Sequence, residues 1–460
     1  MSTIFMSKKE IPVRYEYDVV ILGGGTAGAI AGIAAAREGA KALIVERYGC
    51  LGGSQTMALV TPIMPEGMKE GNAESSISKE IRLRLQAKGF AHKYDGNNSS
   101  WFDTEMLKVE LEELAIENGC DLLYHTSFVD AVMDEQKIKA IIVTNKAGLE
   151  AITAKQFIDC TGDGDLAVLV GAGYTKGNQN GKNQSVSLRF EMVGVDMNRF
   201  GEFLEQGGQA DGYTRPPLLS TYRGNLSKTL DRVLEEKCKE GYVTEQDIHY
   251  VQLFSMPGNP TAISFNCPEL GDSKNAIDPI YMTKKSIEGK QSIVRLATCF
   301  QKFIPGFENS SIGQIAPMLG VRESRNIVTE YQLGIDDVMN YTKYPDAIAM
   351  SDYEIDIHGA KDEALTQKSY NKSLPLNEQY FTIPYRSLIV KGIDNLLVAG
   401  RCAGFDFYVQ STVRVQHTCR YMGEAVGIGA AIGAKENKAA NQVDGAIVRE
   451  KMITYGSDLR

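Results

Sequence analysis

Apolar positions near the start of the chain follow a pattern typical of a strand, a helix and a second strand. Tyr17 to Leu22 reads YDVVIL, a β-branched run of the kind that is buried on both faces of a sheet. An alanine-rich segment then continues to Glu38 and meets Gly39, a residue that commonly ends a helix. The next apolar run, residues 42–45, predicts a second strand. The chain is therefore expected to open with an α/β unit on a parallel sheet.

The glycines between the first strand and the helix have the spacing of a dinucleotide-binding turn. The segment GGGTAGAIAG places Gly23, Gly25 and Gly28 in the order GxGxxG. The first glycine permits a tight turn, the second lets a pyrophosphate approach the backbone, and the third lets helix and strand pack closely. Glu46 ends the second strand 18 positions after Gly28, where a ribose-binding carboxylate is expected. Together these features predict a dinucleotide site.

The hydrophobic period changes after residue 118 from that of a helix to that of short strands. Residues 103–118 predict an amphipathic helix capped by Asp103. Apolar runs separated by polar turns then cover residues 122–160, which is typical of a β-meander. The last run delivers Thr161 and Gly162 to a turn that suits close approach to a nucleotide.

The C-terminal part repeats the order of strand, glycine and helix. Residues 394–402, DNLLVAGRC, predict a strand that ends at Gly400. Ser411 to Ala434 predict one helix with glycine and alanine along one face, which allows close packing on a partner. The N-terminus of such a helix attracts negative charge, so we expect this part to return to the ligand.

The middle of the chain, from about Tyr174 to Tyr385, has the pattern of an insertion. The segments QSVSLRFEMVGVD, TAISFNCPEL and YFTIPYRSLI predict strands, and three longer segments predict helices: KTLDRVLEEKCKE, IDPIYMTKKSIEGKQSIVRLATCFQKF and VRESRNIVTEYQL. We expect this insertion to form a substrate cap, with the ligand where the two parts meet.

Composition narrows the classes of function. The 460 residues suggest two or three folding units, and 49 basic against 58 acidic side chains leave a formal charge of −9. With a pI of about 5.3 and no long Lys/Arg block, nucleic acid is not expected as a main partner. The sequence has no signal-peptide core and no run of about 18 uncharged apolar residues, so we expect a cytoplasmic protein without membrane attachment.

The eight cysteines are scattered, and no two stand in a CxxC relation. This spacing argues against an iron–sulfur cluster, a cysteine-built zinc site and a dense disulfide framework. We therefore expect no metal site and an organic cofactor.

Five motifs follow one another along the chain: GGGTAGAIAG, the acidic strand end at Glu46, LGGS, FIDCTGDGDLA, and NLLVAGRC followed by QSTVRVQHTCRYMGEAVGIGAA. In this order they resemble the FAD-dependent oxidoreductases of the glutathione-reductase-like superfamily, and more narrowly the bacterial FAD-dependent oxidoreductases. The resemblance implies an α/β fold: a Rossmann-like FAD-binding domain, with a parallel sheet plus β-meander, and an inserted α+β cap domain. We expect the FAD-binding domain over residues 1–173 and 386–460, and the cap over 174–385.

The resemblance also implies which positions hold FAD. The glycine turn would hold the pyrophosphate, Glu46 the adenosine ribose, and a backbone group of Val129 the adenine. The helix start near Arg414 and Val415 would stabilise negative charge on the reduced flavin. The full set of implied FAD positions is Gly23, Gly25, Thr26, Ala27, Gly28, Glu46, Arg47, Gly52, Gly53, Ser54, Val129, Thr161, Gly162, Asp163, Gly400, Arg401, Arg414 and Val415.

Two departures from the superfamily limit the chemistry. Classical disulfide reductases carry two cysteines with four residues between them after the strand that ends in Glu, whereas here Gln55 stands at that distance from Cys50. Dithiol chemistry is therefore disfavoured. A second GxGxxG is missing, so a pyridine nucleotide bound in its own Rossmann domain is not expected.

His358 is the first candidate for catalysis. It follows a predicted strand in YEIDIHGAKD, whose alternation puts Asp356 and His358 on one face. There the acid could orient the imidazole as an acid or base. The alternative is a turn histidine at a sheet edge.

Arg322 and Arg386 complete the catalytic candidates. Arg322 and Arg325, one turn apart on a predicted helix, could bind a substrate carboxylate. They could equally form structural ion pairs with Glu323 and Asp337. Arg386 stands where the chain is expected to re-enter the FAD-binding domain. A role in the site and a purely structural role are equally compatible with this position.

The sequence therefore predicts a flavoenzyme that transfers a hydride between a small organic substrate and non-covalently bound FAD. Two alternatives stay open. The chain could be the FAD-binding subunit of a larger electron-transfer complex, or a flavoprotein that modifies RNA, although its acidic pI counts against the latter. A homo-oligomer is also left open.

Overall fold

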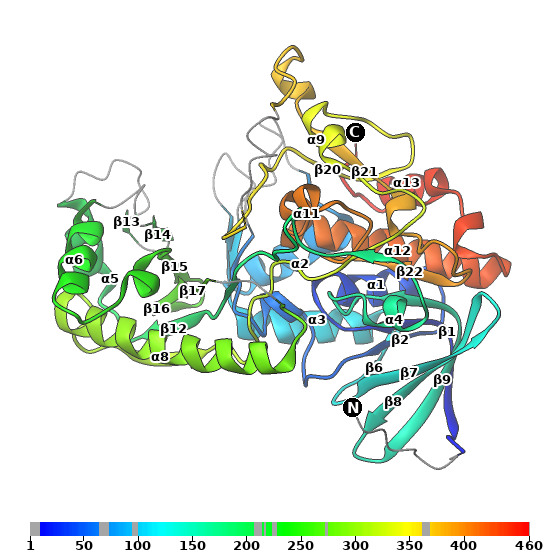
Figure 1. The fold of residues 1–460 in the computed structure, drawn as a ribbon, viewed down its shortest axis with the longest axis horizontal. Coiled ribbons are helices and arrows are strands. Elements are labelled where there is room, and N and C mark those ends of the chain that lie inside the picture. Colours follow the sequence, from blue (N-terminus) through cyan, green and yellow to red (C-terminus); the bar gives the residue numbers. More distant parts are fainter. Residues whose placement is uncertain are drawn as a thin grey trace.

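The computed structural model describes residues 10–63, 73–93, 100–206, 214–215, 218–222, 228–271, 275–360 and 369–459. Figure 1 shows two parts side by side, a smaller one built from the middle of the chain (green) and a larger one that combines N-terminal (blue) and C-terminal (red) segments. The chain thus leaves the larger part, builds the smaller one and returns. This is the α/β fold with an inserted cap that the motifs predicted.

A seven-stranded sheet lies at the centre of the larger part, with the order β6-β2-β1-β9-β8-β7 and with β22 paired to β9. Strands β1, β2, β6, β9 and β22 are parallel, so their carboxyl ends lie at one edge. The predicted strands around residues 17–22 and 42–45 are confirmed. The bounds are β1 Val13–Leu22, β2 Ala42–Val45, β6 Asp121–Leu123, β7 Ser127–Asp134, β8 Lys137–Asn145, β9 Gly148–Asp159 and β22 Leu396–Val398.

The predicted β-meander is present as the antiparallel strands β7, β8 and β9. Strand β9 is long enough to change partners along one side. Residues 148–153 pair with β8, and residues 157–159 pair with β22. The meander and the parallel sheet therefore share one strand, which runs directly into the predicted turn at Thr161.

Helices α1 (Thr26–Arg37) and α12 (Gln416–Glu436) pack closely through glycines. A Cβ at Gly423 would lie 2.3 Å from the carbonyl oxygen of Ala27, and one at Gly427 would lie 2.4 Å from that of Ala31. The predicted small-residue face is thus confirmed.

The single helix predicted from Ser411 to Ala434 is wrong. Helix α11 (Phe407–Val413) ends before Arg414, and α12 begins after Val415, whose backbone is extended (ψ 148°). The Arg414 guanidinium donates to the backbone carbonyl of Asp356 at 3.0 Å, so a tertiary contact holds the break.

The other elements of the larger part surround this centre. Helix α3 confirms the predicted helix and its cap, because the Asp103 carboxylate accepts from the Met106 N–H at 2.9 Å. The remaining bounds are α2 Ser76–Ala87, α3 Thr104–Glu117, α4 Asp165–Leu169, α9 Ile335–Met339, α13 Gly445–Thr454, β3 Pro62–Ile63, β4 Ala91–Lys93, β5 Ser100–Phe102, β10 Tyr174–Thr175, β19 Asn326–Ile327, β20 Ala347–Ser351 and β21 Phe381–Pro384.

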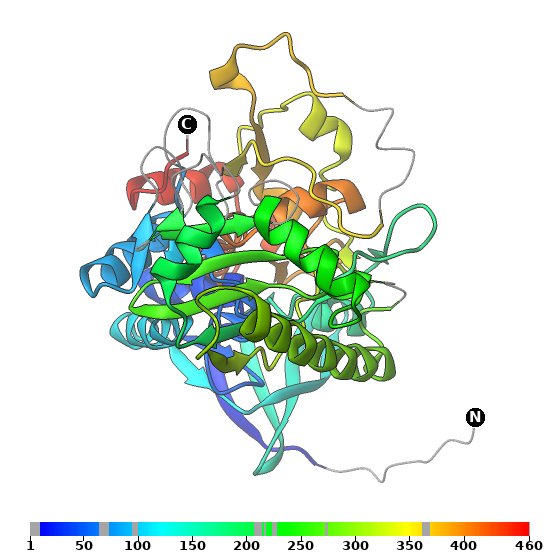
Figure 2. The ribbon, with the colours of Figure 1, turned by 90° about the vertical axis from the view of Figure 1, so that its left-hand side faces the viewer.

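The smaller part is a six-stranded antiparallel sheet with helices on one face, and Figure 2 shows these helices in front of it. Apolar side chains on that face pack under α8, as in the stacked pair Phe190 and Phe265 at 4.3 Å. The predicted helices at 228–240 and 277–303 are confirmed as α6 and α8. The bounds are β11 Val186–Ser187, β12 Phe190–Val193, β13 Thr214–Arg215, β14 Leu218–Tyr222, β15 Gln252–Met256, β16 Asn259–Asn266, β17 Glu269–Leu270, β18 Ser311–Ile315, α5 Met197–Glu205, α6 Lys228–Lys239, α7 Glu245–Ile248 and α8 Pro279–Phe303.

Two hydrophobic clusters underlie the two parts. One joins buried residues from Val19 to Ala172 with others from Ile327 to Leu459, and the second extends from Val186 to Leu319 with Leu59 added. Buried apolar residues at 327–350 and 381–383, which the expected cap included, belong to the first cluster, whereas Ile357 and Ala360 form a small cluster with Phe407. The domain limits given above stay a prediction.

Two local predictions in the loops are wrong. Residues 321–333, predicted as a helix, contain only the short strand β19, because their polar groups bond to distant segments. The Glu323 carboxylate accepts from the Gly177 N–H at 3.0 Å, and the Arg322 carbonyl accepts from Gln410 at 2.7 Å. Residues 352–358 are irregular rather than a strand, since β20 ends at Ser351. Among the described helices, none combines the length and apolarity needed to cross a membrane.

Candidate functional site

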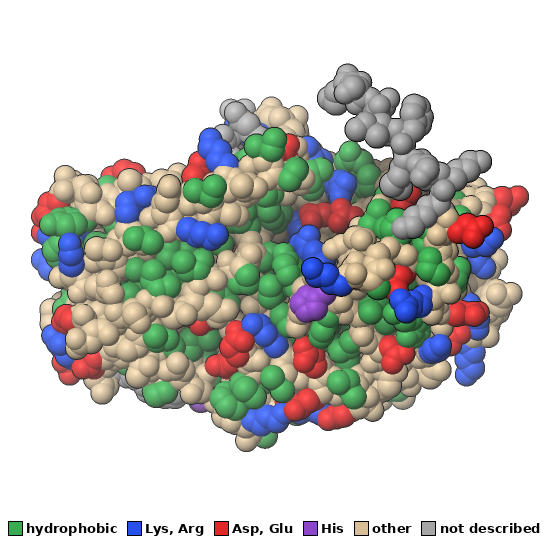
Figure 3. Space-filling view, turned by 90° about the horizontal axis from the view of Figure 1, so that it is seen from below, with side chains coloured by type: hydrophobic (Ala, Val, Ile, Leu, Met, Phe, Trp, Pro, Cys, Tyr) green, Lys and Arg blue, Asp and Glu red, His purple; other side chains and the backbone are tan. Residues whose placement is uncertain are grey.

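A cavity of about 1100 Å³ lies where the smaller part meets the larger one. Its walls come from the loops after β1, β2, β9 and β22 and from the sheet of the smaller part. Parallel strands bring the loops that follow them to one edge of the sheet, which is where α/β folds bind ligands. Figure 3 shows Lys and Arg side chains gathered around a hollow between the two parts.

The glycine turn after β1 is shaped by close contacts on one side and open space on the other. Gly23 has φ +94°, and a Cβ there would lie 2.6 Å from the carbonyl oxygen of Cys160. At Gly28 a Cβ would lie 1.8 Å from the Gly23 oxygen. At Gly25 the nearest atom outside the turn is 3.9 Å away, so the space beside it opens into the cavity.

Gly25 is also the N-cap of α1 and offers no side chain to cap it. The first amides of the helix are thus available to a negatively charged ligand. The LGGS loop packs against this turn: a Cβ at Gly53 would lie 2.7 Å from the Gly25 Cα, and the Ser54 hydroxyl is 3.2 Å from that of Thr26. This cradle has room and donors for a pyrophosphate, so it fits FAD.

Glu46 holds the glycine turn in place. Its carboxylate accepts from the Gly24 N–H at 2.7 Å and from the Tyr48 N–H at 2.9 Å. The residue is buried at the cavity wall, beside Arg47 and across from Val129 of β7. Glu46, Arg47 and Val129 therefore line the same cavity as the glycine turn.

The turn after β9 is organised by Asp159, a fully buried acid that sequence reasoning missed. Its carboxylate accepts from the Thr161 N–H at 3.0 Å, from the Thr161 hydroxyl at 2.8 Å and from the Ala167 N–H at 3.0 Å. Burial raises the pKa of Asp159. In the same turn, Asp163 pairs with Arg401 at 2.7 Å, so the loops after β9 and β22 are joined beside the cavity.

A charged network crosses the middle of the cavity wall. His358 Nδ1 lies 2.8 Å from Glu269 Oε2, and His358 Nε2 lies 3.1 Å from Asp356 Oδ1. An arginine stands at each end: Arg322 Nη2 is 3.7 Å from Glu269 Oε2, and Arg414 Nη2 is 3.4 Å from Asp356 Oδ2. Basic and acidic groups therefore alternate from Arg322 to Arg414.

The network lowers the pKa of both acids. Burial opposes ionisation of Glu269, but the His358 hydrogen bond and the Arg322 charge outweigh it and lower its pKa to about 2. The pKa of Asp356 is well below its usual range, because the His358 hydrogen bond and the Arg414 charge outweigh burial. Both carboxylates are therefore charged at neutral pH.

His358 lies in a loop that lines the cavity. It therefore neither directly follows a strand, as predicted, nor occupies a turn at a sheet edge, as the alternative proposed. The expected contact with Asp356 is present, but the second nitrogen meets Glu269. Carboxylates only accept hydrogen bonds, so both contacts are satisfied only when each ring nitrogen carries a hydrogen. In this arrangement neither nitrogen offers a lone pair to a substrate.

Arg322 and its neighbour Arg325 both line the cavity. Arg322 donates to the Ser185 carbonyl at 2.7 Å, and Arg325 donates to the Asp163 carbonyl at 2.6 Å. With no helix over 321–333, the two do not share a helix face. Arg386 is not among the cavity residues, and it pairs instead with Asp346 at 2.7 Å. The structure therefore does not bring Arg386 together with His358.

The sheet of the smaller part presents polar residues to the cavity that sequence reasoning also missed, chiefly Arg189, Gln252 and Asn266. For these residues the sequence offered one indication of a buried polar position, the arginine inside the apolar run QSVSLRFEMV. Glu269, the acid that holds His358, was missed because nothing local marks it.

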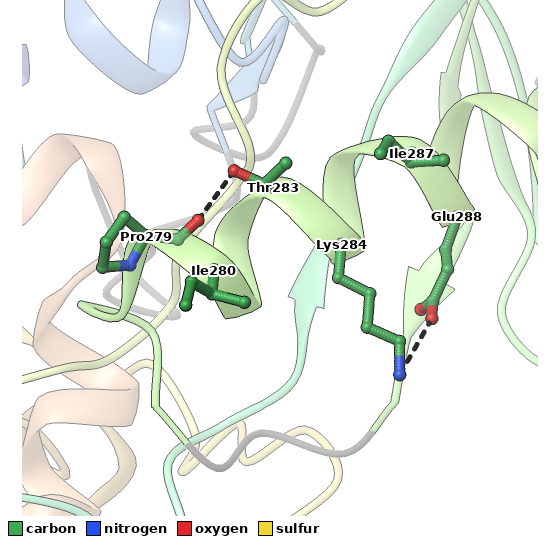
Figure 4. Close-up of a pocket in the computed structure, with 6 residues that line it drawn as sticks. All are labelled: Pro279, Ile280, Thr283, Lys284, Ile287 and Glu288. Atoms are coloured by element: carbon green, nitrogen blue, oxygen red, sulfur yellow. Dashed lines mark hydrogen bonds and ion pairs between the residues drawn. The ribbon is translucent and has the colours of Figure 1, made fainter.

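A second hollow lies on the outer side of α8 (Figure 4). Its polar groups already have partners within the helix: Thr283 donates to the Pro279 carbonyl at 2.7 Å, and Lys284 pairs with Glu288 at 3.8 Å. It therefore offers no free group for chemistry.

Comparison with known sequences agrees with this geometry. The model of a family described as FAD dependent oxidoreductase matches residues 18–452. Thiamine thiazole synthases from Methanococcus aeolicus and Methanococcus vannielii are 30% and 29% identical over 161 and 157 residues, each match covering 32% of this chain. The matches cover 55% and 56% of those proteins, so the chain spans about half the length of these relatives.

Solved structures with a similar arrangement are distant in sequence. A geranylgeranyl bacteriochlorophyll reductase-like protein from Thermoplasma acidophilum is 13% identical, with a TM-score of 0.45 over 96% of this chain and 83% of its own. The p-nitrophenol 4-monooxygenase of Pseudomonas putida is 10% identical, with a TM-score of 0.48 over 96% and 87%. The myxobacterial chondrochloren halogenase is 10% identical, with a TM-score of 0.49 over 96% and 79%.

Proposed function

The chain belongs to the family of FAD-dependent oxidoreductases, and on that basis we propose that it transfers a hydride between a small organic substrate and non-covalently bound FAD. One observation carries the proposal. The cavity that begins at the glycine turn after β1 continues to the polar sheet face of the cap, so cofactor and substrate would share one continuous space.

The positions that the motifs assign to FAD suggest how the cofactor would lie in this cavity. The open space at Gly25 and the uncapped start of α1 would hold the pyrophosphate. Glu46 and the backbone near Val129 would hold the adenosine, and the turn at Thr161 to Asp163 would close over the nucleotide together with Arg401. The start of α12 at Val415 would meet the flavin.

Bound FAD supplies the two-electron chemistry of this family. The protein's own part is to position the substrate and exclude water. The cap sheet covers the cavity, and the network from Arg322 to Arg414 ties the cap to the larger part.

Among the three catalytic candidates, we keep Arg322 and His358 at the substrate side and leave Arg386 out. Arg322 lines the cavity with its guanidinium fixed by Ser185 and Glu269. His358 is a positioning residue, because its two nitrogens hold Glu269 and Asp356. Through these acids it orients Arg322 and Arg414.

The visible spectrum of the purified protein, before and after denaturation, tests the proposal together with the mass of the released cofactor. We expect two flavin bands, release of intact FAD, and bleaching of the bands by a reducing substrate under anaerobic conditions. A colourless protein that does not take up added FAD would contradict the proposal.

A further inference from the structure

Arg189 occupies the centre of the cap sheet's cavity face. It precedes β12, and its backbone carbonyl accepts from the Ala316 N–H of the neighbouring strand at 2.9 Å. Leu188 and Phe190 on either side of it belong to the apolar cluster under α8. Alternation therefore turns Arg189 to the opposite face, where it lines the cavity.

The Arg189 side chain is deeply buried and poorly satisfied. The residue is 2% exposed, its Nε has no hydrogen-bond partner, and its Nη2 reaches only the Ser264 hydroxyl at 3.5 Å. Burial lowers its pKa to about 10, so the guanidinium is still charged at neutral pH. A buried cation without a counter-charge is costly, and proteins pair such groups.

The acids around Arg189 supply this counter-charge only in part, through the Glu191 carboxylate. Among the described residues, no carboxylate forms an ion pair with Arg189. Glu191, two positions along on the same face, has a buried oxygen without a partner, and burial raises its pKa to about 7. It is therefore only partly ionised at neutral pH.

The neighbouring arginines have acids of their own. Arg322 is paired with Glu269, and Arg414 with Asp356. Arg325 is paired with Asp165 and Arg401 with Asp163, so Arg189 is the buried arginine of the cavity wall that forms no ion pair with a described carboxylate. An anionic group of a ligand would supply that partner.

Neutral polar groups flank the guanidinium. Gln252 of β15 pairs across the strands with Asn266 of β16. On the other side of β16, Phe190 pairs with Phe265, so the same register extended by one residue places Arg189 opposite Asn266. The Asn266 amide donates to the Gln252 oxygen at 2.9 Å, which fixes both side chains. The row therefore combines one guanidinium with fixed amide groups, which suits the two oxygens of a carboxylate.

We propose that Arg189 binds a carboxylate of the substrate, and that the enzyme therefore acts on an organic acid. This rests on the proposed function, because it identifies the substrate class of the same cavity. The pyrophosphate of FAD has its own donors at the start of α1, whereas Arg189 belongs to the cap.

The test uses FAD-loaded wild type with acetate, benzoate and succinate, their neutral amides, and inorganic phosphate. Two readouts are followed, the visible spectrum of the flavin and the temperature of unfolding. We expect at least one carboxylate to shift both, and its amide to shift neither. In R189M the dissociation constant should rise at least about tenfold, with an intermediate value in R189K.

The controls separate substrate binding from other roles. R386M, which alters an arginine outside the cavity, should bind the carboxylate as wild type does. R189M should keep its FAD and unfold, without ligand, at the same or a higher temperature, because a buried charge has been removed. The unfolding readout reports on Arg189 whether or not flavin is present.

Four results would overturn the inference: no carboxylate binds wild type, amides bind as well as acids, phosphate binds more tightly than every carboxylate, or R189M binds carboxylate unchanged. Loss of FAD from folded R189M would also overturn it and assign Arg189 to the cofactor. Failure of the proposed function looks different, since wild type itself would then hold no FAD or would not be reduced by any substrate.

Discussion

The imidazole of His358 lies 2.8 Å from the Glu269 carboxylate, across the boundary between the two parts of the molecule. Glu269 belongs to β17 beside the cap sheet, and His358 follows β20 of the larger part. This contact therefore holds the cap against the cofactor side of the cavity.

The His358–Glu269 contact predicts a loss of stability in acid. The pKa of Glu269 is lowered from 4.5 to about 2, so its contribution is fully present above the unfolded value and disappears as the pH falls toward 2. At most it amounts to roughly 3 kcal/mol, at about 1.4 kcal/mol per pKa unit. The free energy of unfolding can be measured with urea at several pH values from about 3 to about 7. It should depend less steeply on pH in E269Q than in wild type. Identical slopes would contradict the assignment.

A double-mutant cycle on His358 and Glu269 should show strong coupling. H358A leaves the buried Glu269 carboxylate and the partly exposed Asp356 carboxylate without their shared donor, and it should lower the free energy of unfolding by about 3 kcal/mol. In the E269Q background, H358A should lower the free energy of unfolding by at least about 1 kcal/mol less than it does in wild type, because the effects of mutating two residues in contact do not add. Turnover of an identified substrate should fall in H358A while FAD content stays the same. Unchanged turnover would remove His358 from the site.

Gly25→Ala should reduce the FAD content of an otherwise folded protein. The nearest neighbour of the added Cβ would be 3.9 Å away, so the chain has room for it, but the methyl group would occupy the space beside the α1 amides. Gly334→Ala is a matched control, because Gly334 is likewise a helix N-cap and its Cβ would be 3.6 Å from the nearest atom. Purified G334A should carry FAD as wild type does. Equal FAD content in both variants would place the pyrophosphate elsewhere.

R386M should affect stability and not the site. Arg386 pairs with Asp346 and lies 4.8 Å from the Tyr331 ring, and its side chain is 36% exposed. Contacts of this kind contribute about 1 kcal/mol, which chemical unfolding can measure. Substrate affinity and FAD content should be unchanged. A large fall in turnover would return Arg386 to the catalytic candidates.

Gly427→Ala should destabilise the larger part of the molecule, in which α1 and α12 pack together. Its Cβ would meet the Ala31 carbonyl oxygen at 2.4 Å, and backbone cannot move aside cheaply. We expect a loss of about 1–3 kcal/mol in the free energy of unfolding, typical of overpacking. A variant as stable as wild type would mean that α1 and α12 can separate without cost.

Local patterns were enough to predict the cofactor side. The turn at Gly23 to Gly28 is built from neighbouring residues, and the strand and helix beside it have unmistakable periods. Errors arose where tertiary contacts overrode a local period. Residues 321–333 look helical, but the carboxylate of Glu323 and the carbonyl of Arg322 bond to other segments. The helix predicted from Ser411 is broken because Arg414 bonds to Asp356.

The sequence by itself determined the unit of β1, the glycine turn and α1, because residues a few positions apart form the turn that we propose holds the pyrophosphate. The substrate side was decided by the tertiary structure. Glu269 and His358 are 89 positions apart, and Asp356 and Arg414 are 58 apart, so only packing brings them together. Which face of its strand Arg189 occupies depends on α8 covering the other. Such contacts depend on how distant segments meet, and no local period encodes that.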